Sequence, residues 1–157
     1  MKHSFFRMIL CLTAAAASML LAGIRTGEAM LCSRGASAED TAGRTIRALA
    51  ERDYPELCRL ARLSVTPEGQ GIWQSVRIAG IRVTGKDVRD DRACYALEIE
   101  VADEGDSAFS RGLQPRWLWM VKDRDGWYAA GLMSGGPPDA AWWAGRGPLT
   151  AWPSGAG

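Results

Sequence analysis

Apolar residues between positions 38 and 52 recur at helical spacing. Charged residues fall mostly on the opposite side, which is the pattern of an amphipathic helix packed on a core. Ser37 is suited to cap the first turn, and the helix is expected to end near Asp53, because Tyr54 precedes a proline and so disfavours helical backbone. The apolar side contains Ala38, Ala42, Ile46, Leu49 and Ala50.

A second, shorter helix is predicted after Pro55, because proline suits the first turn of a helix. Its apolar stripe contains Leu57, Leu60 and Ala61. The turn-forming residues 66–69 are expected to end it. From Ile72 onwards the helical period is lost, and strands are predicted instead.

The second half of the chain alternates between apolar and polar positions, as strands do. The predicted strands are residues 76–83, 95–101, 115–122 and 127–133, and the first has a bulge at Ala79 and Gly80. The connections between them are a charged turn at 85–91, a polar loop at 103–112 and a hairpin turn at Asp125 and Gly126. The strand at 115–122 is apolar on both faces, which is typical of a central strand. These elements predict an α+β fold in which two N-terminal helices pack on a four-stranded antiparallel sheet.

The N-terminal residues have the order of a secretory signal. Lys2 and Arg7 precede the uncharged stretch 8–23, and small residues ending at Ala29 stand where a signal peptidase would cut. We therefore expect residues 1–29 to direct export, which would place the rest of the protein in the periplasm or outside the cell.

Two alternatives exist for this apolar stretch. Residues 5–24 are long enough to remain as an uncleaved membrane anchor, and the basic residues before them would leave the domain outside the cytoplasm. The stretch would otherwise be a buried core helix. A lipid anchor is disfavoured, because Leu31 rather than a small residue precedes Cys32. The expected boundaries are 1–29 for the signal or anchor, 30–37 for a linker, 38–133 for the folded domain and 134–157 for a tail rich in glycine, proline and tryptophan.

The composition excludes several kinds of chemistry. With 19 basic and 18 acidic residues, the chain has no basic excess for binding nucleic acid. Its one histidine, His3, lies in the signal, so the folded domain lacks histidine for catalysis or metal ligation. The four cysteines show no metal-binding spacing. We therefore expect no cofactor and no metal, and we assign no catalytic residue.

Two of the cysteines, Cys58 and Cys94, fall on a predicted helix and a predicted strand. In an oxidising compartment they are candidates for a disulfide. The alternative is that both stay reduced and pack as small core residues.

Two sequence segments point to a family. Residues 48–57 (ALAERDYPEL) look like a break between a long and a short helix, and residues 117–122 and 125–128 look like a final hairpin. With the order of the elements over residues 38–133, they resemble the nuclear transport factor 2-like (cystatin-like) superfamily, particularly its small exported bacterial members of unknown function. The resemblance implies a curved sheet that wraps the long helix and leaves a cone-shaped pocket. Such pockets serve enzymes, binding proteins and assembly scaffolds alike, so the fold does not define the function.

Large aromatic residues are the candidate ligand-binding residues. Trp117, Trp119, Trp127 and Tyr95 would line a pocket for an apolar ligand, and the alternative is ordinary core packing. Alternation places Trp117 and Trp119 on one strand face, and Trp127 is expected to join them from the neighbouring strand.

Enzymes of the resembled superfamily place carboxylates and often a tyrosine in the pocket. Glu98 and Glu100 share one strand face, which we expect to be exposed to solvent. Asp53 is predicted to be a helix-end residue. The tyrosines that such a site would draw on are Tyr54, Tyr95 and Tyr128.

The tail holds Trp142, Trp143 and Trp152, which would dock either on the domain itself or on a partner or membrane surface. Three functions are therefore open. The first is an exported, non-catalytic module that binds a small apolar ligand or a protein. The others are a membrane-tethered assembly scaffold of a secretion-type complex, and a small pocket isomerase or hydrolase that uses a carboxylate and a tyrosine.

Overall fold

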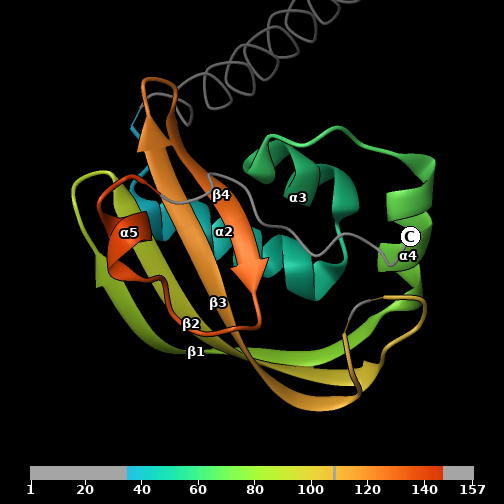
Figure 1. Ribbon diagram of the computed structural model, residues 1–157. Coiled ribbons are helices and arrows are strands. Elements are labelled where there is room, and N and C mark those ends of the chain that lie inside the picture. The colour runs from blue at the N-terminus through green and yellow to red at the C-terminus, as the bar shows by residue number, and fades with distance from the viewer. Residues whose placement is uncertain (1–34, 108, 147–157) are drawn as a thin grey trace, which may run out of the picture. The chain divides into compact units, whose positions relative to one another are not determined.

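The computed structural model describes residues 35–107 and 109–146, and it has the α+β architecture that the sequence predicts. The elements are helices α2 (Ala38–Glu51), α3 (Tyr54–Ala61) and α4 (Pro67–Ser75), strands β1 (Arg77–Val88), β2 (Arg92–Asp103), β3 (Gly112–Asp123) and β4 (Gly126–Met133), and the short helix α5 (Ala140–Trp143). The four strands are hydrogen-bonded in chain order, and all neighbours are antiparallel. The sheet bends around α2 (Figure 1).

The first two helices begin and end with local capping contacts. The side chain of Ser37 accepts a hydrogen bond from the backbone N–H of Asp40, whose carboxylate accepts one from the backbone of Ser37 in return. Arg52 ends α2 in the left-handed conformation. Asp53 then caps α3 by accepting a hydrogen bond from the backbone N–H of Glu56. The prediction that Asp53 is a helix-end residue is thus confirmed.

The segment between α3 and the sheet differs from the prediction. Residues 66–69 do not merely end a helix, because Thr66 caps a further helix, α4, by accepting a hydrogen bond from the backbone N–H of Gly69 at 3.1 Å. Pro67 suits the first turn of that helix. No side chain of α4 is fully buried, so apolar periodicity carried little signal there.

The first strand is also longer than predicted. β1 continues through residues 85–88, whose polar composition predicts part of a charged turn. Their backbone pairs with β2 from Ala96 to Ala93, while their side chains are exposed. Pairing with a neighbouring strand therefore overrides the polar composition. The bulge predicted at Ala79 and Gly80 is confirmed by a register shift there.

The sheet has two buried regions on opposite faces. The inner face, defined here as the face toward α2 and α3, carries the main core, whose largest fully buried members are Leu49, Leu97, Ile99, Leu118 and Met120. The outer face carries a smaller cluster of Val121, Tyr128, Ala130 and Trp142, which α5 covers. Figure 1 shows α2 and α5 on opposite sides of the strands. The central strand β3 is thus buried on both faces, as predicted.

Several expectations fall outside the described residues. These are the signal or anchor at 1–29 with its candidate span at 5–24, most of the linker at 30–37, and Trp152. Within residues 35–107 and 109–146, no helix is both long and apolar enough to cross a membrane.

Candidate functional site

The four predicted ligand-binding aromatics do not meet in one place. Tyr95 and Trp127 contribute to the inner core, whereas Trp119 packs on the outer cluster, and Trp117 shares its face by strand alternation. The register explains the split, because Trp127 lies opposite Lys122 while Trp119 lies opposite Cys94 and Gly131. The prediction that Trp127 joins Trp117 and Trp119 is therefore wrong.

The disulfide considered between Cys58 and Cys94 does not form, and both are free, buried thiols. Cys94 alternates with Ala93 and Tyr95, which face the inner core, so it lies on the outer face. Cys58 belongs to α3, which packs on the inner face, and the sheet therefore separates the two sulfur atoms. Burial, with the nearby charge of Asp87, raises the pKa of Cys94 to about 12. The Cys94 thiol thus stays protonated at neutral pH and acts as a core residue.

The carboxylates of the sheet are not placed for an inner catalytic site. Glu98 and Glu100 alternate with inner-face residues and so point outward, and Glu98 forms an ion pair with Arg82 on β1. Tyr128 also lies on the outer cluster. A carboxylate-and-tyrosine arrangement on the inner face is therefore not assembled from Glu98, Glu100 and Tyr128.

Two polar side chains interrupt the apolar inner face. Gln114 and Arg116 occupy the same face of β3 as Leu118, because they lie opposite Ile99 and Leu97 of β2. A guanidinium N–H of Arg116 donates to Oε1 of Gln114, and Nη1 donates to the carbonyl oxygen of Pro115 at 3.1 Å. The two residues thus form one polar group within an apolar layer.

Aromatic rings adjoin this group on the side of α4. The guanidinium carbon of Arg116 lies 5.3 Å from the ring centroid of Phe109. Phe109 in turn packs edge-on against Trp73 of α4, with ring centroids 5.8 Å apart. Phe109 is only 6% exposed, so the cation rests on a buried aromatic surface.

The charge of Arg116 is not neutralised locally. Of the residues in the described ranges, none provides a carboxylate within ion-pair distance of it. Burial lowers the pKa of Arg116, as expected when a cation is moved out of water without a counter-ion. Gln114 is 8% exposed, and its Nε2 donates to no acceptor in the described part of the chain. Both groups can therefore bind an anion or another strong acceptor.

Sequence reasoning missed this pair, although the signal was present. The predicted strand at 115–122 is dominated by its tryptophans, but Gln114 and Arg116 share the alternating positions of Leu118 and Met120. Two polar residues on the buried face of a central strand are unusual, and this pattern indicates a candidate site.

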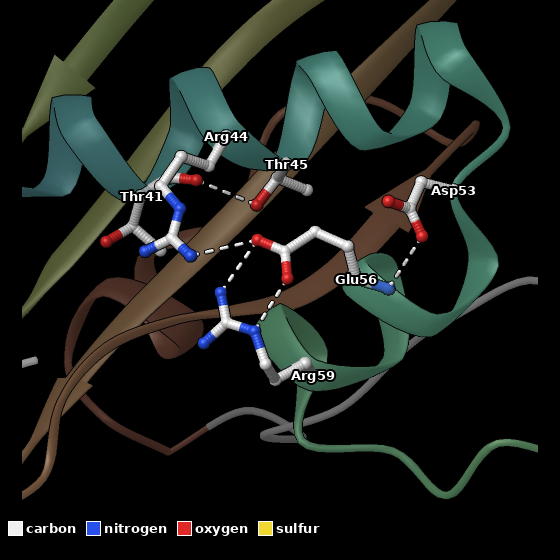
Figure 2. Close-up of polar contacts among 6 residues, drawn as sticks. All are labelled: Thr41, Arg44, Thr45, Asp53, Glu56 and Arg59. Atoms are coloured by element: carbon white, nitrogen blue, oxygen red, sulfur yellow. Dashed lines mark hydrogen bonds and ion pairs between the residues drawn. The ribbon is translucent and has the colours of Figure 1, made fainter. Parts of the chain in front are cut away.

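A second polar cluster joins α2 to α3. Figure 2 shows the carboxylate of Glu56 between the guanidinium groups of Arg44 and Arg59. Arg44 Nη2 donates to Oε1 at 2.9 Å, while Arg59 donates to both oxygens at 2.6 and 2.7 Å. Thr45, buried on α2, donates its hydroxyl to the carbonyl oxygen of Thr41. Both oxygen atoms of the carboxylate accept hydrogen bonds from these arginines. We therefore infer that the cluster holds α2 and α3 together.

The ion pairs of Glu56 predict a dependence of stability on pH. Hydrogen bonds from Arg59, and then from Arg44, hold the pKa of Glu56 below its ordinary value of 4.5, although burial opposes them. The ionised carboxylate therefore stabilises the fold above the unfolded pKa, and this contribution is lost as the pH falls through the folded pKa. Glu56→Gln should lower the free energy of unfolding by about 1 kcal/mol at pH 7 and by less at acid pH.

Urea unfolding at a series of pH values measures this effect. Glu51→Gln, which changes an exposed carboxylate of α2, is the matched control. The stability of this variant should fall toward acid pH as steeply as that of the wild type, and more steeply than that of Glu56→Gln. Asp40 and Asp123 also have lowered pKa values, so part of the pH dependence will remain in Glu56→Gln. Equal pH profiles for wild type and Glu56→Gln would contradict the assignment.

The tail packs on its own domain through α5. Asp139 caps this helix. Trp142 is 1% exposed and belongs to the outer cluster with Tyr128, and it packs against Trp119. Trp143 packs edge-on against Trp142 and beneath the guanidinium of Arg89, whose central carbon lies 4.0 Å from the ring centroid. Trp142 and Trp143 therefore dock on their own domain in this structure.

Comparisons with known proteins add no assignment. No protein-family model matches the chain, and no curated protein matches it in sequence. Within the described ranges, no group of three or more histidine, cysteine, aspartate or glutamate side chains is arranged to hold a metal ion. The function is therefore inferred from this chain's own residues.

Proposed function

We propose that this protein is an exported, non-catalytic binding module whose inner face takes a small apolar ligand with an anionic group, such as a carboxylate. The observation that carries the proposal is Arg116, a half-buried guanidinium on an apolar strand face without a carboxylate partner in the described part of the chain. Export is supported by the secretory pattern of residues 1–29.

The energetics favour an anionic ligand group at this point. A buried charge without a partner is costly, and pairing it with a carboxylate through a charge-assisted, two-pronged contact recovers much of that cost. Arg116 already donates to Gln114 and Pro115, so a ligand group would add to or replace these neutral acceptors. The amide Nε2 of Gln114 offers a second donor beside it.

The surroundings favour an apolar body on the same ligand. The half-buried Trp73 and the buried ring of Phe109 lie next to the guanidinium. Leu97 and Ile99 of β2, which pair with Arg116 and Gln114, belong to the fully buried core beside them. A binding site with a largely apolar lining and a few oriented polar groups is the usual arrangement for small ligands. The outward direction of Glu98 and Glu100 makes a carboxylate-based isomerase or hydrolase the less supported alternative.

Calorimetric titration with decanoate tests the proposal, with decanol as the uncharged counterpart. We expect saturable binding of decanoate and a weaker response to decanol. Arg116→Gln should reduce decanoate affinity by about tenfold or more, because a charge-assisted hydrogen bond is lost.

The matched control is Arg124→Gln, which removes an equal charge from a side chain that is 93% exposed in the turn between β3 and β4. It should leave the affinity unchanged. The proposal fails if decanoate does not bind, or if the two arginine variants weaken binding equally, since the charge of Arg116 would then have no specific role.

A further inference from the structure

The outer face holds an unusual cluster of buried hydrogen-bond donors. It consists of Arg92 at the start of β2, Trp119 on β3 and Trp142 on α5, and we refer to these three residues as the arginine–tryptophan cluster. Nε and Nη1 of Arg92 and the indole Nε1 atoms of Trp119 and Trp142 are all buried and have no acceptor among the residues that the structure describes. All four are donors, and the cluster contributes no unpaired acceptor.

Trp142 adjoins both of the other side chains. The ring centroids of Trp119 and Trp142 are 5.0 Å apart, and the guanidinium carbon of Arg92 lies 4.8 Å from the ring centroid of Trp142. Gly145 follows α5 so closely that a Cβ atom there would lie 3.4 Å from Nη2 of Arg92. The cluster is thus enclosed between the sheet and the segment that carries α5.

The charge of Arg92 makes the arrangement costly as it stands. Arg92 is 5% exposed and forms no ion pair within residues 35–107 and 109–146. Stacking on Trp142 offsets part of the cost through the cation–π attraction. It does not supply an acceptor for the N–H groups, and each buried donor without one is destabilising.

An anion suits this cluster of donors better than water does. A water molecule could accept hydrogen bonds but would leave the positive charge uncompensated, whereas an anion does both. The unpaired nitrogen atoms have almost no exposed surface, so only a small anion is compatible with the enclosed position. We propose that Arg92, with the indole N–H groups of Trp119 and Trp142, binds a small inorganic anion of the size of chloride beneath α5.

This site is separate from the proposed ligand site, because the two lie on opposite faces of the sheet. An anion held by β2, β3 and α5 together stabilises the docked position of α5. Any species that binds only the folded state raises its stability with concentration. The stability of the protein should therefore depend on the identity of the anion and not only on ionic strength.

The test compares sodium chloride with sodium gluconate, whose anion is too large to be enclosed, at matched ionic strength. The full-length protein is titrated while tryptophan fluorescence and the thermal midpoint are followed. We expect a saturable fluorescence change with chloride and a midpoint that rises with its concentration. Arg92→Gln should weaken the affinity for chloride by about tenfold or more.

Arg89→Gln is the matched control, because Arg89 stacks on Trp143, the neighbour of Trp142 on α5. In contrast to Arg92, the side chain of Arg89 is 53% exposed and pairs with Asp87. It should keep the saturable response. The line width of the chloride nuclear magnetic resonance signal, measured on the wild type, keeps the test decisive if Arg92→Gln does not fold. Equal responses to chloride and gluconate, or no line broadening by the wild type, would overturn the proposal.

Discussion

Replacing Trp142 by alanine is expected to lower the free energy of unfolding by about 3–5 kcal/mol, which is the cost typical of truncating a buried aromatic side chain. Trp142 is 1% exposed and is the largest fully buried side chain of the described residues. Its ring covers Val121, Tyr128 and Ala130 on the outer face and packs against Trp119. Urea unfolding followed by circular dichroism measures the loss.

Trp143→Ala is the natural comparison, because it removes the neighbouring tryptophan of the same helix. Trp143 is only half-buried and packs at the margin of the cluster, beneath the exposed Arg89. Its removal should cost about 1–2 kcal/mol. If Trp142→Ala were as stable as the wild type, α5 would not be docked on the sheet in solution. That result would contradict the burial of the outer cluster beneath α5.

The second large effect is expected at Leu118, at the centre of the inner core. Leu118 is fully buried on β3, opposite Tyr95 on one neighbouring strand and Leu132 on the other. Leu118→Ala should cost about 2–5 kcal/mol, because it removes apolar contacts and leaves a cavity that the sheet cannot close. The unfolding midpoint in urea should fall without a large change in the slope of the transition.

Leu113→Ala provides the same chemical change on the same strand. Leu113 is 64% exposed, so its truncation should alter the stability by no more than about 0.5 kcal/mol. Similar losses for Leu118→Ala and Leu113→Ala would show that burial on β3 is not as described.

Most of the elements could be read from local sequence. The N-cap at Ser37, the break at Asp53 and Pro55, and the turn at Gly126 each depend on a few neighbouring residues, and all three are present in the structure. The alternation of Tyr95, Leu97 and their neighbours likewise reports one buried strand face. These features are local because capping, proline geometry and side-chain alternation act over a few residues only.

Other features were invisible because they depend on partners distant in the chain. The strand character of residues 85–88 comes from pairing with β2, and the helix at Pro67–Ser75 carries too little buried surface to leave a clear pattern. The register shift that follows Trp119 in β3 is also a property of the strand pair, because Trp119 lies opposite Gly131 while Met120 lies opposite Ala129. A one-residue change of register moves a side chain to the opposite face, and this shift brings Leu132 onto the inner face opposite Leu118.

The sequence by itself determined the α+β class, the order of most elements and the absence of histidine from the folded domain. Only the tertiary structure decided that Arg116 lies without a carboxylate on the inner face, that Cys94 and Cys58 are kept apart, and that Trp142 meets Arg92 across the outer face. The reason is physical. Helices and strands follow from neighbouring residues, whereas the pairing of charges and the burial of rings follow from contacts between segments far apart in the chain.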